Sequence, residues 1–82
     1  MDWSFIIPFS CIYRSELNYW LRSNIGPFSV VFNEQRWTYT NKSINKEYHL
    51  QYFLFDLLED EIVQLKLTFP ELILQKHRRS ST

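Results

Sequence analysis

The spacing of apolar residues changes along the chain and predicts a different element in each segment. Residues 1–9 are mostly apolar but are interrupted by Pro8, which predicts an extended arm or short strand packed on the domain. Residues 10–24 place apolar side chains three or four positions apart, as in a helix. Gly26 suits the position just after such a helix, and Pro27 cannot continue it. These signals predict one helix that ends before Gly26.

Residues 28–40 have the two-residue period of β-strands. Apolar side chains alternate over 28–33 and again over 36–40, on either side of a short polar connection. Aromatic and β-branched residues, which favour strands, are frequent in both runs. The pattern predicts a β-hairpin, and two strands alone are only marginally stable, so we expect a helix to cover it.

A longer apolar stripe follows a polar junction at 41–45. From Leu50 to Phe69 the apolar residues repeat at three and four positions, which predicts an amphipathic helix over 46–67. Ser43 or Asn45 is suited to cap this helix. Within the stripe, residues 62–69 also alternate as a strand does, so a strand there remains an alternative.

The last part of the chain predicts a short helix and a tail. Thr68, Pro70 and Glu71 have the order of a capped helix start, and apolar residues follow them. The sequence therefore predicts an α+β fold, a small single domain over residues 1–75. Its expected order is helix, β-hairpin, long helix and short helix. Residues 76–82 are expected to form a basic flexible tail.

Composition is that of one small globular domain. The chain has 82 residues, 45% of them hydrophobic, and nine Lys and Arg balance nine Asp and Glu. This combination excludes an intrinsically disordered chain, and no apolar stretch is long enough to predict a membrane span. The expected core is formed by Leu17, Leu21, Val30, Phe32, Phe53, Leu54, Leu57, Leu58, Leu65 and Phe69.

Candidate chemistry is sparse. Cys11 is the single cysteine, so neither an internal disulfide nor a zinc framework is expected, and we predict a reducing compartment such as the cytoplasm. Motifs for nucleophilic catalysis, for phosphate binding and for zinc proteases are missing, and Gly26 is the single glycine. The sequence therefore indicates no catalytic residues, no cofactor, no metal and no small-molecule substrate.

One charged residue does not fit its expected surroundings. Asp56, Glu59 and Asp60 would share the solvent-exposed face of the predicted helix, without the spacing of a calcium loop. Glu61 would instead lie within the apolar stripe. Either Glu61 pairs with a Lys or Arg, or the helix bends there, or that face meets a polar partner.

Aromatic residues are the strongest indication of function. Three Trp, five Tyr and seven Phe exceed what so small an interior can hide, so some are expected at the surface, where exposed aromatic clusters usually mark a partner. We therefore predict a small non-catalytic protein-binding module: a complex subunit, an adaptor, an inhibitor or a homo-oligomer. Arg36, Trp37 and Tyr39 are the candidate contacts on the hairpin, with Trp3, Tyr13 and Tyr19 next in order. The competing explanation is that the hairpin aromatics simply cover the long helix.

The alternative function is binding of RNA or single-stranded nucleic acid. Lys76, Arg78 and Arg79 make the end of the chain cationic, and Trp37 and Tyr39 would stack on bases. The zero net charge argues against it, since domains that bind nucleic acid usually carry a basic excess.

Overall fold

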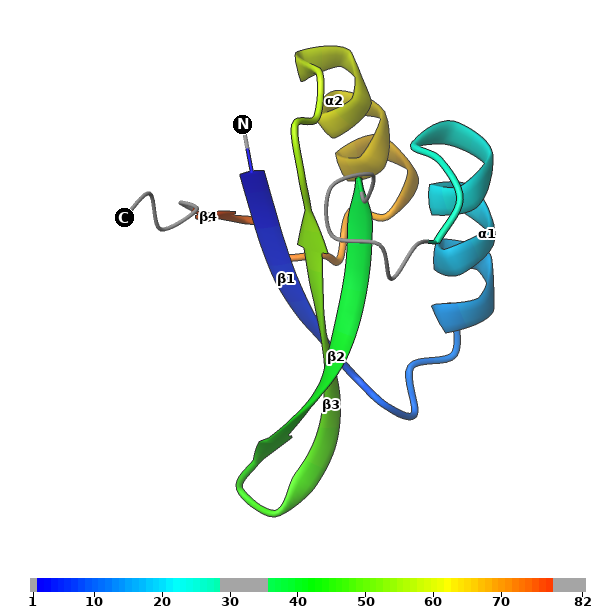
Figure 1. Cartoon of the computed structure of the whole chain (residues 1–82). Helices are drawn as coiled ribbons and strands as arrows, with labels where there is room; N and C mark the ends of the chain where they lie inside the picture. The colour runs from blue at the N-terminus through cyan, green and yellow to red at the C-terminus, as the bar shows by residue number, and fades with distance from the viewer. Residues whose placement is uncertain (1, 29–35, 78–82) are drawn as a thin grey trace.

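The computed structural model describes residues 2–28 and 36–77, which form two helices and four strands. In chain order they are β1 (Asp2–Pro8), α1 (Arg14–Asn24), β2 (Trp37–Ile44), β3 (Glu47–Leu54), α2 (Glu59–Thr68) and β4 (Gln75–His77) (Figure 1). The predicted α+β class is confirmed, whereas the predicted order of elements is not.

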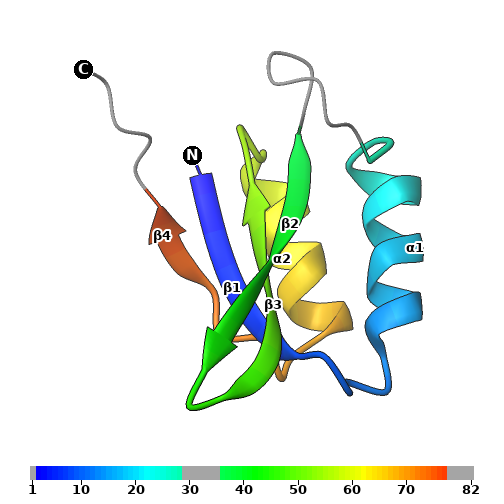
Figure 2. The ribbon, with the colours of Figure 1, turned by 60° about the horizontal axis from the view of Figure 1, so that its bottom comes forward.

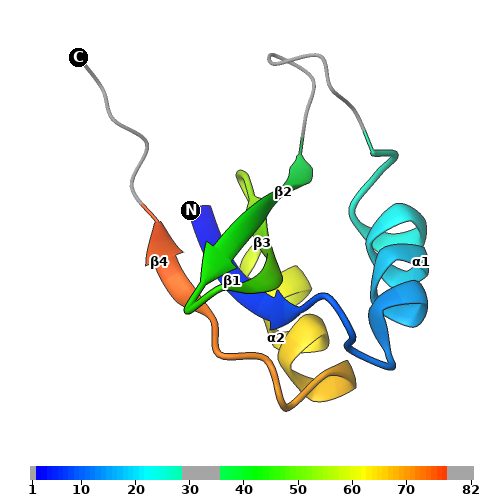
Figure 3. The same ribbon diagram turned by 90° about the horizontal axis from the view of Figure 1, so that it is seen from below.

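The four strands form one antiparallel sheet in the order β2-β3-β1-β4. The N-terminal segment, predicted as an arm or short strand, is β1, one of the two inner strands of the sheet. Figures 2 and 3 show α1 and α2 on the same side of this sheet. The connectivity is the β-α-β-β-α-β arrangement known as split β-α-β or ferredoxin-like. Because both crossover helices cover one face, the side chains that point to that face form the core.

The hairpin of this fold joins β2 to β3 and replaces the first half of the predicted long helix. Ile44 pairs with Glu47, and the two loop residues Asn45 and Lys46 have φ angles of 51° and 67°. Positive φ at both positions is the requirement of a type I′ turn, whose twist matches that of paired strands. The helix predicted over 46–67 is therefore wrong before residue 59, because every second residue from Leu50 to Leu54 faces the core as in a strand.

The two helices agree better with the sequence. Helix α1 ends at Asn24, and the Gly26 N–H donates to the Leu21 carbonyl at 3.0 Å with a Gly26 φ of 145°, as the stop signal predicts. Helix α2 spans the segment for which a strand was the alternative, so that alternative is wrong.

The predicted short helix after Thr68 is absent from the described residues. Thr68 ends α2 instead of capping a new helix, and a turn leads past Pro70 to the sheet edge. There β4 pairs with β1 over Asp2–Ser4. Pro70 has no backbone N–H to donate, and a single helical turn after it would leave most backbone groups without hydrogen-bond partners. Pairing of β4 with β1 supplies such partners.

The first strand of the predicted hairpin cannot be compared with the structure. Residues 29–35 lie outside the described part of the chain, and with them Val30 and Phe32. The predicted second strand, 36–40, lies largely within β2, but its hairpin partner is β3.

The core lies between the sheet and the two helices. Of the predicted core residues, Leu17, Leu21, Leu54, Leu57, Leu65 and Phe69 are buried. Phe53 is half-buried because its neighbours Tyr52 and Leu54 take the helix-facing side, and Leu58 is 66% exposed just before α2. In the middle of the sheet Phe5 and Tyr52 stand opposite each other, with their rings stacked at 4.9 Å.

Candidate binding groove

Trp37, predicted as an interface residue, belongs to the core. Its side chain is 1% exposed, stacks on Tyr52 with ring centres 6.3 Å apart, and donates from Nε1 to the Gly26 carbonyl at 2.6 Å. Tyr39 lies on the same strand face, is 38% exposed, and packs on Tyr52 at 5.2 Å. The expected exposed patch on the hairpin is therefore wrong for Trp37, because this strand face is the one that the helices cover.

Arg36 is occupied within the fold. Its guanidinium donates to both carboxylate oxygens of Glu61, at 2.6 and 3.2 Å, and to the carbonyls of Ile25 at 3.0 Å and Asp56 at 3.1 Å. The Arg36–Glu61 ion pair thus joins the end of α1 to the start of α2. The first of the three explanations for Glu61, pairing with a cation, is confirmed.

The ion pair also changes the titration of both groups. The hydrogen bonds from Arg36 lower the pKa of Glu61 below its usual value, against the opposing effect of burial. The bond to Glu61 likewise raises the pKa of Arg36. Glu61 Oε1 accepts a further bond from the Leu58 N–H at 2.9 Å, at the start of α2. Arg36 therefore stabilises the fold, and a partner contact of its exposed part stays a prediction.

The predicted basic contacts at the end of the chain are only partly described. Lys76 lies in β4 and pairs with Trp3. Arg78 and Arg79 lie outside the described residues. Lys76 and His77, the first two residues of the predicted tail, are thus part of the sheet edge.

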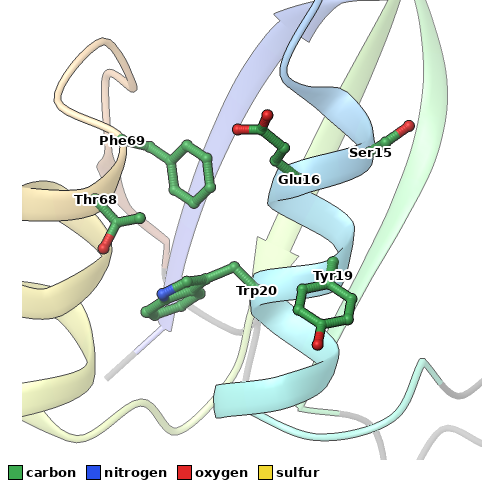
Figure 4. Close-up of a pocket in the computed structure, with 6 residues that line it drawn as sticks. All are labelled: Ser15, Glu16, Tyr19, Trp20, Thr68 and Phe69. Carbon is green, nitrogen blue, oxygen red and sulfur yellow. The ribbon is translucent and has the colours of Figure 1, made fainter.

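A groove lies between α1 and the end of α2, on the helix side of the molecule (Figure 4). Its main cavity has a volume of about 410 Å³, and a smaller hollow of about 170 Å³ shares three of its lining residues. We call this surface the α1–α2 groove; its residues are Tyr13, Ser15, Glu16, Tyr19, Trp20, Thr68, Phe69, Pro70 and Glu71.

Aromatic rings dominate this groove. The Phe69 ring packs on Tyr13 at 5.7 Å and meets Trp20 edge-on at 6.4 Å, and Figure 4 shows Trp20 and Phe69 in the gap between the helices. Phe69 is buried, Tyr13 and Trp20 are half-buried, and Tyr19 is 69% exposed. The groove therefore has a fixed aromatic floor with an exposed ring at its edge.

The charge in the groove is of one sign. The ionisable side chains that line it are Glu16, Glu71 and the phenols of Tyr13 and Tyr19. Burial, a hydrogen bond with Cys11 and the charge of Glu71 raise the pKa of Tyr13 to about 12, so this phenol is neutral at physiological pH. At neutral pH the fixed charges of the groove are thus two carboxylates.

A second hollow of about 480 Å³ lies on the other side of α2, against the edge of the sheet. Trp3, Leu58 and Val63 are among its apolar residues, while Lys66, Lys76 and Glu59 bring charges of both signs. The Lys66 ammonium lies 5.2 Å from the centre of the Trp3 ring. This hollow is thus lined by apolar side chains together with charges of opposite sign.

The sequence predicted some of the groove residues. Tyr13 and Tyr19 were among the aromatics expected at the surface, and residues 13, 16 and 20 share one side of a helix by their spacing. Phe69 was expected only as a core residue. Its position opposite Trp20 depends on how the helices are placed on the sheet, and the sequence pattern of α2 carries no signal for that.

Comparison with known proteins gives no relative: no family model, no curated protein and no solved structure matches this chain. Within residues 2–28 and 36–77, no three His, Cys, Asp or Glu side chains come together as a metal site requires. Neither of the two described helices has the length and apolar character to cross a membrane. Function must therefore be argued from the surface itself.

Proposed function

We propose that this chain is a small non-catalytic module that binds another protein through the α1–α2 groove, as a complex subunit, an adaptor or an inhibitor. The observation that supports this most is the group of Tyr13, Tyr19 and Trp20 around the buried Phe69. Exposed aromatic side chains beside a packed aromatic cluster are typical of surfaces that contact a partner. Tyr and Trp are also the side chains most often found as energetic centres of interfaces.

The position of these rings supports a pre-formed contact surface. Phe69 and Trp20 are held by packing between two helices, and binding would therefore cost them little conformational freedom. The groove is lined by Ser15 and Glu16, but none of its described residues is a histidine, the base that most often activates a serine nucleophile, and none is a cysteine or lysine. The groove thus favours binding over catalysis.

Residence in a reducing compartment remains a prediction from Cys11 alone.

The nucleic-acid alternative has less support than the sequence suggested. Trp37, one of the two rings expected to stack on bases, is in the core, and Arg36 beside it is paired with Glu61. Its remaining support is the basic end of the chain, which lies mostly outside the described residues.

Partner capture with two matched tyrosine variants tests the proposal. Tyr19→Ala removes the most exposed ring of the groove, whereas Tyr48→Ala removes an equally exposed ring (74%) that does not line it. A tagged chain is used to capture proteins from its source cells at physiological salt, with and without nuclease. Circular dichroism and thermal unfolding verify that both variants fold.

We expect wild type and Tyr48→Ala to retain the same partner. Tyr19→Ala should lose about 2 kcal/mol of binding free energy, which is roughly thirtyfold in affinity. Retention of the partner by folded Tyr19→Ala would exclude the groove as the contact surface. Release of the captured protein by nuclease would favour the nucleic-acid alternative.

A further inference from the structure

The two carboxylates of the α1–α2 groove have no cationic partner in the described part of the chain. Glu16 lies in the first turn of α1, and Glu71 lies in the turn after α2. Both are exposed, and the one ion pair among the described residues is that of Arg36 with Glu61. Two exposed acidic side chains therefore flank one aromatic groove and give it a negative charge.

Two nearby cations, Arg14 and Lys66, contact aromatic rings outside the groove. Arg14, two residues before Glu16, donates to the Phe9 carbonyl at 3.4 Å, and its guanidinium lies 4.5 Å from the centre of the Phe9 ring. Lys66 lies over Trp3 on the other side of α2. Both contacts place a cation on an aromatic face, so this chain already uses the interaction twice outside the groove.

The groove combines the two features that a guanidinium recognises. Aromatic faces attract a cation through their quadrupole and accept the flat guanidinium by stacking, and carboxylates accept its paired N–H donors. A lysine ammonium matches the charge but has no planar face to stack and no fork of donors. The main cavity, of about 410 Å³, has room for a long side chain to lie along the groove; Glu16 lines this cavity, and Glu71 lines the hollow that adjoins it.

We propose that the α1–α2 groove binds an arginine side chain from a basic segment of the partner protein, which lies against the aromatic floor with its guanidinium at Glu16 and Glu71. This inference rests on the proposed function and names the chemistry of the partner. The hollow beside Trp3 does not lead to such a choice, because its lysines and its glutamate carry opposite charges.

A peptide titration followed by NMR tests the selection of arginine. The full chain is titrated with acetyl-Gly-Arg-Gly-Arg-Gly-amide and with the same peptide carrying citrulline, which keeps the shape of arginine but lacks its charge. The indole N–H signal of Trp20, assigned with Trp20→Phe, reports on the groove. We expect the arginine peptide to move this signal, with an affinity at least about tenfold above that of the citrulline peptide and weakened by salt.

Three charge variants separate a local effect from one of net charge. Glu16→Gln and Glu71→Gln remove a carboxylate from the groove, whereas Glu59→Gln removes the same charge from the hollow on the other side of α2. We expect each groove variant to lower the affinity for the arginine peptide several-fold, with little change for Glu59→Gln. An equal loss in all three variants would overturn the proposal.

Failure of this inference can be told apart from failure of the proposed function. Equal binding of both peptides at Trp20, or binding of neither, overturns the arginine assignment, while partner capture that depends on Tyr19 still supports the binding module. Movement of the Trp20 signal with protein concentration alone would assign the groove to a second copy of this chain, which also overturns the proposal. Loss of Tyr19 dependence in the capture experiment would contradict the proposed function itself.

Discussion

The turn between β2 and β3 offers a sharp test of the fold, because the wild-type residue is unfavourable there. Lys46 has a φ of 67°, in the left-handed region that suits glycine and strains residues with a Cβ atom. Its partner in the turn, Asn45, is among the residues that tolerate this region best. Lys46→Gly converts the turn to Asn-Gly, the sequence that type I′ turns favour most, and we expect it to stabilise the protein.

The gain can be estimated from two opposing contributions. Left-handed backbone costs a non-glycine residue about 1–2 kcal/mol. Glycine avoids this cost, but it loses more conformational freedom than lysine when the chain folds. That loss offsets roughly 0.5–1 kcal/mol of the gain in stability. The exposed Lys46 side chain has no hydrogen bond or ion pair in the described part of the chain. The expected net gain is about 0.5–1 kcal/mol, or roughly 2–8 °C in Tm for a domain of this size.

Chemical and thermal unfolding followed by circular dichroism measure the effect. The matched control is Lys42→Gly in β2, where a lysine with ordinary strand geometry is exposed; we expect a loss of about 0.5–1 kcal/mol there. If residues 46–54 were helical, glycine at 46 would instead destabilise the chain. A lower Tm for Lys46→Gly, similar to that of Lys42→Gly, would therefore refute the turn and with it the β2–β3 hairpin.

Two further predictions concern stability. Glu61→Gln should cost about 1–2 kcal/mol at pH 7, a range reduced for the partial exposure of Arg36. The pKa of Glu61 is lowered on folding, so its contribution to stability is complete above the unfolded pKa near 4.5 and is lost as pH falls through the folded pKa. Urea unfolding between pH 7 and pH 3 should therefore show the free energies of unfolding of wild type and variant converging in acid. Leu57→Ala should cost ~2–5 kcal/mol and nearly unfold so small a domain, whereas an unchanged Tm would contradict the burial of Leu57.

The helices were predictable where local signals agreed. Gly26 and Pro27 ended α1 because a left-handed residue followed by proline stops a helix in any tertiary context. Acidic residues at 59–61 favour the helix N-terminus found there, although the helix predicted over 46–67 ran through them. Both signals act within one turn of backbone, and neither depends on the rest of the fold.

The error over residues 46–54 has a specific origin. Leu50 and Leu54 fit a helical stripe and also a strand, since a separation of four residues satisfies both periods. Tyr52 between them favoured the strand, but the hairpin signal was weak because the turn has Lys46 where glycine is expected. The sequence therefore carries no clear turn signal at the position where the chain reverses between β2 and β3.

The candidate site depended on topology more than on residue type. Aromatic excess correctly predicted exposed rings, and Tyr19 is one of them. The two crossover helices determine which side of β2 is covered. The sequence pattern alone therefore could not predict that Trp37 lies in the core and Trp20 at the groove. Arg36 and Glu61 were both singled out, yet 25 positions separate them and only the tertiary fold brings them together.

The Arg36–Glu61 ion pair and the groove lie at opposite ends of the same helix pair, and their roles should therefore be separable. Arg36 contacts the end of α1 through the Ile25 carbonyl and the start of α2 through Glu61. Trp20 and Phe69 fill the gap towards the other end. Glu61→Gln loosens the first junction without removing a ring or a groove charge, so partner capture by this folded variant should fall by less than that of Tyr19→Ala. A larger fall would mean that the ion pair sets the spacing of the helices, and that the shape of the groove contributes more to binding than its aromatic surface.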